Sequence, residues 1–442
     1  MFQSPFSASL FAFRQTAFRY VDLRILFALL VLTYPFSAFS EEPAKPSAPF
    51  TVNTTLFTKH GNTFPALKSP DNVQHFTVFE GVQTQAGYNH GAVLAGFKGQ
   101  IFCQWQTSGK DEDGPGTHVI YSFSEDGEHW TKVRVLAPAR KHAIVTSGGW
   151  WTQGDTLIAF INVWPDDTPQ KQGHTEYATS SDGMNWSAFK PVTGAGGRPV
   201  QGIIEQDLKA LPSGRILTAF HMQPGLHATP YYTEDPSATS GWTAGNFTNL
   251  SHKDTISREL EPSSFVDADN NIVMTFRDQA GSFRVLASVS KDNGDTWSLP
   301  AVTGMPDSRA KQSAGNLPDG TAYLVNNPSG TKDRLPLVVT LSRDGKHFNH
   351  ALLARDESTL PPMKFAGEYK RTGYSYPKSI VWRDALWISY AVNKEDIAVT
   401  RIPVSSLRVQ DSLETNPDQC YATGGNFMCT DTASTEPNRF NR

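Results

Sequence analysis

The chain has 442 residues, of which 38% are hydrophobic, 11% aromatic and 19% charged, and it contains 34 Gly and 29 Pro. This composition is typical of a globular protein built from short strands and many turns, and it excludes a disordered or fibrous chain. The formal charge of −4 excludes a basic nucleic-acid-binding protein, because neutralising phosphates requires an excess of Lys and Arg.

Residues 1–40 have the pattern of a secretory signal peptide. Three arginines within residues 14–24 precede the apolar run 25–32, and small residues end the segment at 38–40. The apolar run is too short to span a bilayer comfortably, so we expect cleavage before Glu41, with an uncleaved anchor as the alternative. We therefore expect the protein to be secreted or periplasmic, with no membrane association once the leader is removed.

The three cysteines fit an exported protein. Cys420 and Cys429 enclose a short loop in the C-terminal tail, residues 409–442, where we expect them to form a disulfide. Cys103 lies in an apolar stretch and is expected to be a buried small hydrophobic residue. No Cys or His spacing indicates a zinc site and no motif indicates a cofactor, while calcium bound by loop oxygens stays open.

A short motif recurs along the chain. Each copy reads Ser or Thr, then Asp two residues later, and ends on an aromatic residue. The copies start at Ser124, Ser180, Thr233, Ser290 and Ser342, at intervals of 56, 53, 57 and 52 residues. The Asp suits a tight turn whose amides its carboxylate caps, and the aromatic residue is expected to pack beneath the hairpin. Such even spacing is typical of a repeat architecture.

Short runs rich in β-branched and aromatic residues flank each copy, so each repeat has room for four strands. The motif resembles the Asp box of the sialidase superfamily, whose members are β-propellers. The resemblance covers residues 85–408 and implies an all-β fold, a β-propeller with four-stranded blades. The repeats indicate six blades, with seven as the alternative, and residues 41–84 are expected to close the last blade or to contribute to a seventh.

Strands in a propeller blade alternate in direction, which sorts the polar residues between two faces. The starts of the innermost strands, and the loops between second and third strands, lie opposite the Asp-box turns. His, Arg, Lys and aromatic residues gather on that face in this sequence. Aromatic rings suit sugar faces, and cations suit a carboxylate or sulfate. We therefore expect the partner to be an acidic polysaccharide or oligosaccharide. We expect the protein itself to be a monomer.

Residues 88–130 resemble the first blade of the propeller polysaccharide lyases, notably the rhamnose–glucuronate lyases and more distantly the ulvan lyases. That resemblance implies β-elimination at a uronic acid, in which a base removes the C5 proton, a cation neutralises the carboxylate and an acid protonates the leaving oxygen. We expect His90 as base or proton carrier and Tyr374 or Tyr376 as its partner, with His221 or His118 as a second histidine. The candidate substrate-binding residues are Asn89, His118, Trp150, Glu261, Arg277, Arg309, Lys311, Gln312 and Arg371.

A sialidase-type glycosidase is the alternative enzyme. Such an enzyme uses a Tyr nucleophile paired with a Glu, an Asp acid, and three arginines that clamp the substrate carboxylate. The resemblance implies Tyr374 or Tyr376 as the nucleophile, Glu261 as its partner and Asp111 or Asp113 as the acid.

The arginine clamp of a sialidase is incomplete in this sequence. Arg277, with Arg309 or Arg371, would supply two of the three arginines, but no Arg stands between residues 41 and 132, where the first is expected. A substrate carboxylate there would lose a bidentate partner, which argues against true sialidase activity. Lyase cleavage is therefore the leading expectation, ahead of the glycosidase, and a non-catalytic glycan-binding propeller is the third.

Overall fold

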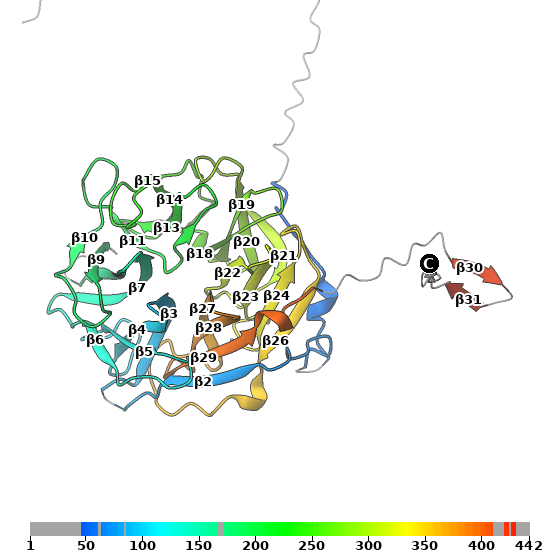
Figure 1. Cartoon of the computed structure of the whole chain (residues 1–442), viewed down its shortest axis with the longest axis horizontal. Coiled ribbons are helices and arrows are strands. Elements are labelled where there is room, and N and C mark those ends of the chain that lie inside the picture. The colour runs from blue at the N-terminus through cyan, green and yellow to red at the C-terminus, as the bar shows by residue number, and fades with distance from the viewer. Residues whose placement is uncertain are drawn as a thin grey trace, which may run out of the picture. The chain divides into compact units, whose positions relative to one another are not determined.

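The computed structural model describes residues 46–60, 63–83, 85–166, 172–253 and 255–409, and the backbone of 420–423 and 426–429. Its main sheets form six antiparallel blades, and Figure 1 shows the inner strands β3, β7, β11, β18, β22 and β27 around a common centre. The predicted all-β propeller is confirmed, with six blades rather than seven. The expected signal peptide, residues 1–40, lies outside the described residues.

In each blade the strands follow one another in chain order from the centre outward. Blade 1 consists of β3 (Tyr88–Phe97), β4 (Gln100–Ser108), β5 (His118–Ser124) and β6 (Arg134–Ala137). Blade 2 consists of β7 (Ala143–Gln153), β8 (Thr156–Pro165), β9 (His174–Ser180) and β10 (Lys190–Pro191). Blade 3 has a divided inner strand, and consists of β11 (Gly202–Ile204), β12 (Lys209–Ala210), β13 (Ile216–Met222), β14 (His227–Thr233) and β15 (Thr243–Ala244).

The remaining three blades repeat this arrangement. Blade 4 consists of β18 (Glu259–Val266), β19 (Ile272–Asp278), β20 (Arg284–Ser290) and β21 (Ala301–Pro306). Blade 5 consists of β22 (Ser313–Asn316), β23 (Ala322–Asn326), β24 (Leu337–Ser342) and β26 (His350–Arg355). Blade 6 consists of β27 (Tyr374–Trp382), β28 (Ala385–Val392), β29 (Asp396–Pro403) and, from the other end of the propeller's sequence, β2 (Gln74–Phe79).

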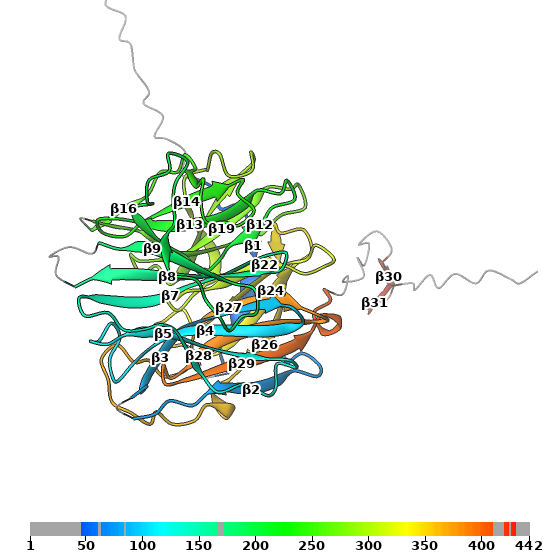
Figure 2. The same cartoon turned by 60° about the vertical axis from the view of Figure 1, so that its left-hand side comes forward.

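Strand β2 closes the ring. It pairs antiparallel with β29, and the two strands lie side by side in Figure 2. Upstream of it, β1 (Thr51–Val52) pairs in parallel with β25 (His347–Phe348) on blade 5. Because the outer strand of blade 6 comes from the start of the propeller, no turn joins its third strand to its fourth. Six blades therefore need only five copies of the repeated motif.

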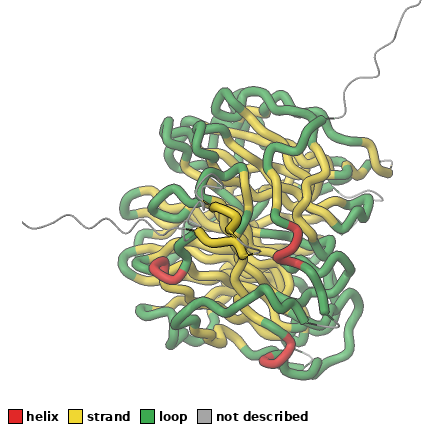
Figure 3. The backbone as a smooth tube through the Cα atoms, turned by 90° about the vertical axis from the view of Figure 1, so that its right-hand side faces the viewer, coloured by secondary structure: helices red, strands yellow, loops and turns green. Residues whose placement is uncertain are grey.

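Helical structure among the described residues is confined to three short 3-10 turns, shown in red in Figure 3. They are η1 (Thr54–Phe57), η2 (Glu357–Thr359) and η3 (Val404–Ser406). No helix in this part of the chain has the length and apolar character that a membrane span requires. Two small hairpins complete the strands, β16 (Ser251–Lys253) with β17 (Ile256–Ser257), and β30 (Cys420–Thr423) with β31 (Asn426–Cys429).

The hairpin of β30 and β31 contains the two cysteines of the expected disulfide. Cys420 and Cys429 are opposite one another in its register. Their side chains lie outside the described residues, so the disulfide remains a prediction. Cys103 is fully buried and unpaired, as the apolar stretch around it indicates.

The first Asp box shows why the motif makes a stable turn. The Asp126 carboxylate accepts hydrogen bonds from the amides of Glu128 and His129, both at 2.8 Å, and from the Ser124 hydroxyl at 2.9 Å. These bonds hold the pKa of Asp126 well below its ordinary value. The Trp130 indole donates to the carbonyl of Gly127 at 2.9 Å. Trp130 is half-buried rather than fully buried beneath the hairpin, so its packing contributes less than the motif suggests.

Apolar side chains fill the space between neighbouring blades, where the β-branched and aromatic runs of the sequence face one another. Between blades 1 and 2, the ring of Trp150 packs edge-on against Phe102 and Tyr121, at centroid distances of 6.1 and 6.3 Å. Its indole nitrogen donates to the carbonyl of Val93 at 3.0 Å. Such contacts hold the inner strands in place around the centre.

Several inner strands carry a bulge near the centre. Register shifts interrupt β3, β7, β18 and β27. In β3 the bulge includes Gly91, whose φ of 66° costs a glycine little. In β18 and β27 the corresponding residues are Glu261 and Tyr376, with φ of 54° and 58°. Side chains larger than Gly are strained there, and strain of this kind is concentrated at functional sites.

Candidate functional site

A pocket of about 170 Å³ opens where the inner strands begin, opposite the Asp-box turns. Residues from blades 1 to 4 and blade 6, with Lys311 from the segment before β22, form its wall. Its polar and ionisable lining residues include His90, Gln106, Glu112, Asp113, Glu205, Gln206, His221, Glu261, Lys311 and Tyr376. Many of the polar residues expected at the starts of the inner strands meet at this face.

Tyr376, Glu261 and Arg277 form a connected group in this pocket. An Nη1 hydrogen of Arg277 is donated to the hydroxyl of Tyr376 at 2.9 Å, and the same nitrogen lies 3.1 Å from Glu261 Oε2. Burial opposes the ionisation of Glu261, but the charges of Arg277 and Lys311 outweigh it and lower the pKa of this carboxyl. Burial, followed by the charge of Glu261, raises the pKa of Tyr376 well above its ordinary value. The group therefore holds a neutral phenol beside an ionised carboxylate.

His221 holds the backbone of Glu261. Its Nε2 accepts a hydrogen bond from the amide of Glu261 at 3.1 Å, and its Nδ1 lies 3.0 Å from Glu205 Oε1. Because Nε2 is an acceptor, the proton is on Nδ1 and is donated to Glu205. Glu205 in turn pairs with the ammonium of Lys311 at 2.9 Å. Both ring nitrogens of His221 are thus engaged, so this histidine positions Glu261 and is not the free base expected from the sequence.

His90 is buried in the wall of the pocket, and its Nε2 lies 4.0 Å from Glu112 Oε1. Its ring lies against Tyr376 at a centroid distance of 4.2 Å, and neither ring nitrogen has a hydrogen-bond partner among the described residues. Burial, followed by the charges of Lys394, Lys311 and Arg334, lowers the pKa of His90 well below its ordinary value. His90 is therefore a neutral imidazole at neutral pH. Its place in the pocket is the one expected from the sequence.

Three further ionisable side chains lie around Tyr376. They belong to Lys394, Arg334 and Glu112, and none of them was among the residues predicted for the site. Lys394 donates to Glu112 Oε2 at 2.7 Å, and its ammonium lies 5.7 Å from the centre of the Tyr376 ring. The guanidinium of Arg334, buried and bonded to the Ser308 hydroxyl at 3.1 Å, also lies 5.7 Å from that ring. Glu112 follows Asp111 directly in the sequence. The two acidic residues differ in the direction in which their side chains point. Lys394 lies in the turn between β28 and β29, which joins the second and third strands of blade 6 and so lies at the face expected for the site.

Four expected site residues are structural instead. The Tyr374 hydroxyl is held by Arg355 and Thr359 in the core between blades 5 and 6, each at 3.1 Å, so it is not available as a nucleophile or base. The Asn89 amide donates to two backbone carbonyls, at 2.8 and 2.6 Å, and its oxygen accepts from an indole at 3.0 Å. Trp150 packs between blades 1 and 2. Gln312 is fully buried, and its amide donates to a threonine hydroxyl at 3.3 Å.

The other expected site residues differ in burial, and most of them do not line the pocket. Arg309 is half-buried, and burial followed by the charge of Arg277 lowers its pKa. Arg371 is exposed, and His118, half-buried, donates from Nδ1 to a backbone carbonyl at 2.9 Å without lining the pocket. Of the two expected acids, Asp113 lines the pocket, whereas Asp111 accepts a backbone hydrogen bond at 2.6 Å outside it.

The described part of the chain brings together no group of three His, Cys, Asp or Glu side chains that could hold a metal ion. The pocket's own groups are instead paired with one another, as buried charges usually are. The groups that the pocket offers to a substrate are a Tyr–Glu pair, a neutral His and several cations.

The fold and this pocket define a six-bladed β-propeller with a polar site at the mouth where its inner strands begin. A family model for the BNR repeat-like domain matches residues 99–388, and the chain belongs to this family. The predicted sialidase-superfamily propeller is thereby confirmed. No curated protein sequence matches the chain.

Solved structures share this fold at low sequence identity. A Hadza microbial sialidase matches with a TM-score of 0.60 and 13% identity, over 75% of this chain and 69% of that chain. The intramolecular trans-sialidase from Ruminococcus gnavus matches with a TM-score of 0.58 and 13% identity, over 76% and 98% of the two chains. Another structure, described as a sialidase, matches with a TM-score of 0.47 and 21% identity, over 76% of this chain but only 33% of that chain. The expected likeness to polysaccharide lyases is not confirmed by these matches.

Proposed function

We propose that this protein is an exported glycosidase of the sialidase type that cleaves a carboxylate-bearing sugar from a glycan, with Tyr376 as nucleophile. The observation that carries the proposal is the contact of one Arg277 nitrogen with both the Tyr376 hydroxyl and the Glu261 carboxylate. A phenol with a raised pKa needs a base beside it to become a nucleophile, and Glu261, with its lowered pKa, is ionised and in place to accept the proton.

The proposed reaction has two steps. Tyr376 Oη forms a bond to the anomeric carbon while the bond to the leaving oxygen breaks. The phenol proton passes to Glu261, and Asp113 protonates the leaving oxygen. In the second step water attacks the same carbon, Asp113 takes the proton of the water, and Glu261 returns its proton to Tyr376. At the end of the second step every group is back in its starting protonation state.

The cations around Tyr376 favour an acidic substrate. Arg334 and Lys394 lie against its ring, and half-buried Arg309 is near enough to Arg277 and Tyr376 for these groups to act on its pKa. These groups are placed to hold a carboxylate and to stabilise negative charge on the phenolate. Residues 41–132, where the resemblance places the first arginine of a sialidase, contain no Arg, so the preferred acidic sugar differs from sialic acid in how its carboxylate is held.

A polysaccharide lyase is the second candidate, and the geometry of His90 favours it. A neutral imidazole with two unpartnered nitrogens, in contact with a tyrosine ring, is a suitable base for the C5 proton of a uronic acid. In that reaction Tyr376 would protonate the leaving oxygen, and no covalent intermediate would form.

One experiment separates the two reactions. The protein is incubated with fluorogenic glycosides of sialic acid and of uronic acids, and with uronate polysaccharides, while fluorophore release and ultraviolet absorbance are followed together. The glycosidase predicts fluorophore release without new absorbance, lost in Tyr376→Phe and in Glu261→Gln. A rise in absorbance from a new C4=C5 double bond, abolished by His90→Ala, would replace the glycosidase by the lyase.

A further inference from the structure

A second and larger cavity, of about 500 Å³, opens at the other end of the inner strands, on the side of the Asp-box turns. The ends of β3 and β27 line it, whereas the starts of the same strands line the candidate site. Gln206 lines both pockets and separates them. Its amide donates to the carbonyls of Gly91 and Ser147, at 2.7 and 3.1 Å, and its oxygen accepts from Lys311 at 3.1 Å. The two cavities are thus distinct.

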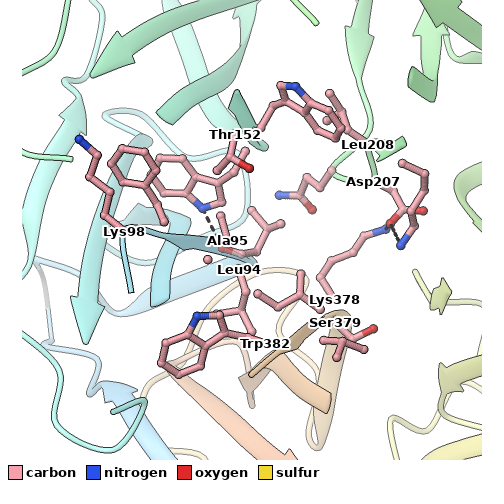
Figure 4. Close-up of a pocket in the computed structure, with 18 of the residues that line it drawn as sticks. Leu94, Ala95, Lys98, Thr152, Asp207, Leu208, Lys378, Ser379 and Trp382 are labelled. Atoms are coloured by element: carbon pink, nitrogen blue, oxygen red, sulfur yellow. Dashed lines mark hydrogen bonds and ion pairs between the residues drawn. The ribbon is translucent and has the colours of Figure 1, made fainter. Parts of the chain in front are cut away.

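Lys378 on β27 faces this second cavity, and Figure 4 shows it beside Asp207. The residue is only 1% exposed, and none of the described residues accepts a hydrogen bond from its ammonium group. The nearest carboxylate oxygen, Asp207 Oδ1, lies 3.8 Å away. A buried ammonium without acceptors is costly, and a ligand oxygen in the cavity would remove that cost.

The carboxylate nearest to Lys378 is already shared. Asp207 Oδ2 accepts from the Ser263 hydroxyl at 2.7 Å and from the Ser264 amide at 3.1 Å. Its Oδ1 lies 3.3 Å from the ammonium of Lys209. Two lysines therefore face one carboxylate at the floor of the cavity, which leaves an excess of positive charge. An anionic group on a ligand would balance it.

The walls of the cavity are aromatic. Trp151 and Trp382 are half-buried and line the cavity. Trp150 also lines it and is more deeply buried. The ring of Trp382 packs directly over the backbone of Gly96, where an added Cβ would come within 2.7 Å of it. The guanidinium of Arg383 also lies over the Trp382 ring, 4.1 Å from its centre. Indole rings beside a polar floor suit the apolar face of a sugar ring, and the volume is within the range of small-ligand sites.

We propose that this cavity is a second saccharide-binding site, in which Lys378 pairs with the carboxylate of an acidic sugar while Trp151 and Trp382 hold the ring. The site goes beyond the proposed glycosidase and does not depend on it, since no residue of the Tyr376 group lines it. Its role is binding rather than chemistry, because its polar floor consists of lysines, a shared Asp207 and the engaged amide of Gln206.

Proton uptake provides a signature specific to this site. Burial lowers the pKa of Lys378 to about 8, with Asp207 acting against the shift. Lys311, Glu205 and Lys209 are the other charged groups that act on it. A carboxylate that pairs with Lys378 raises this pKa, so binding at pH 8 takes up protons. Calorimetry in buffers of different ionisation enthalpy measures that uptake directly.

The test is a calorimetric titration of the full chain with D-glucuronate at pH 8, with D-glucose as the uncharged comparison. We expect binding with proton uptake, at least tenfold weaker binding of D-glucose, and at least a tenfold loss of D-glucuronate affinity in Lys378→Met. Lys291→Met, at an exposed lysine remote in the sequence, is the matched control and should bind as the parent does. Trp382→Leu provides a second variant from the wall if Lys378→Met does not fold, as judged by thermal melting.

The test of the second site does not depend on whether the proposed glycosidase activity is found. Tyr376→Phe should retain the binding event and its proton uptake, and Lys378→Met should retain any glycan cleavage. Absence of binding at millimolar D-glucuronate, equal binding of D-glucose, or unchanged affinity in Lys378→Met and Trp382→Leu would each overturn the second site.

Discussion

The guanidinium of Arg277 donates a hydrogen bond of 2.9 Å to the hydroxyl of Tyr376, although 99 positions separate the two residues in the chain. Arg277 comes from the second strand of blade 4 and Tyr376 from the inner strand of blade 6. The same Arg277 nitrogen contacts Glu261, so one guanidinium orients both the phenol and its carboxylate partner. The positive φ of Glu261 and Tyr376 indicates that the fold accepts backbone strain in order to place these two side chains.

Tyr376→Phe should abolish glycan cleavage and leave the fold intact. The variant removes only the hydroxyl, whose partner Arg277 retains Glu261 and Gln279 as acceptors. We expect kcat to fall by at least about 10³-fold and the melting temperature to change by little, because the ring packing is kept. Turnover of the most active substrate in the panel and a thermal melt measure the two effects. Near-normal turnover would exclude Tyr376 as the nucleophile.

His221→Ala should weaken catalysis through Glu261. The substitution leaves the Glu261 amide without its buried acceptor and removes one of the two partners of the Glu205 carboxylate, which keeps Lys311, at a cost of about 1–3 kcal/mol in the free energy of unfolding. Because Glu261 then shifts relative to Tyr376, we expect kcat to fall at least tenfold with a smaller change in KM. His221→Gln, which can still accept the amide hydrogen bond, should restore part of kcat. An unchanged kcat in the Ala variant would show that His221 supports only stability.

Acidification should destabilise the protein partly through Glu176. This half-buried carboxylate pairs with Arg140 and with His174, at 2.9 and 3.1 Å. Burial acts to raise the pKa of Glu176, but these partners outweigh it and lower that pKa from 4.5 to about 2. A carboxyl with a lowered folded-state pKa stabilises the fold above pH 4.5, and that contribution is lost as the pH falls towards 2.

Glu176→Gln tests this dependence, because it cannot ionise. The melting temperature of the parent should fall more steeply than that of the variant between pH 4.5 and 2, while the parent is the more stable of the two at pH 7. Parallel melting curves across this window would show that Glu176 does not contribute.

Gly127→Ala should be strongly destabilising. Gly127 in the first Asp box has φ of 83°, and an added Cβ would come within 2.1 Å of the Trp387 ring in blade 6. We expect a loss of at least about 2 kcal/mol, from backbone strain together with the displaced ring. Gly99→Ala is the matched control: its φ is 78°, but no heavy atom lies within 4 Å of the new Cβ. Chemical unfolding of both variants separates the clash from the strain, and equal losses would contradict the packing.

The sequence predicted the propeller because its signals are local and repeated. In each Asp box, side chains bond to amides within a few residues, as Asp126 does to Glu128 and His129. A turn of this kind forms wherever the motif occurs, so its spacing gives the length of chain in each blade. The alternation of strands within a blade then indicates which end of each strand faces the site. His90, Glu261, Lys311 and Tyr376 are found at that mouth for this reason.

Side-chain direction could not be read in the same way. Tyr374 and Tyr376 are two positions apart on β27, yet a bulge follows Ser375, and one hydroxyl lies in the blade core while the other lies in the pocket. Neither local propensity nor spacing predicts such a bulge.

What the sequence by itself determined is the class of fold, the face that carries the candidate site and the residue types available there. Only the tertiary structure decided which of those residues meet. Lys394, Glu112 and Arg334 come from three blades and gather around Tyr376, and Lys378 and Asp207 meet at the opposite mouth. Burial and charge pairing across the centre of the ring depend on all six blades being closed, so no local stretch of sequence specifies them.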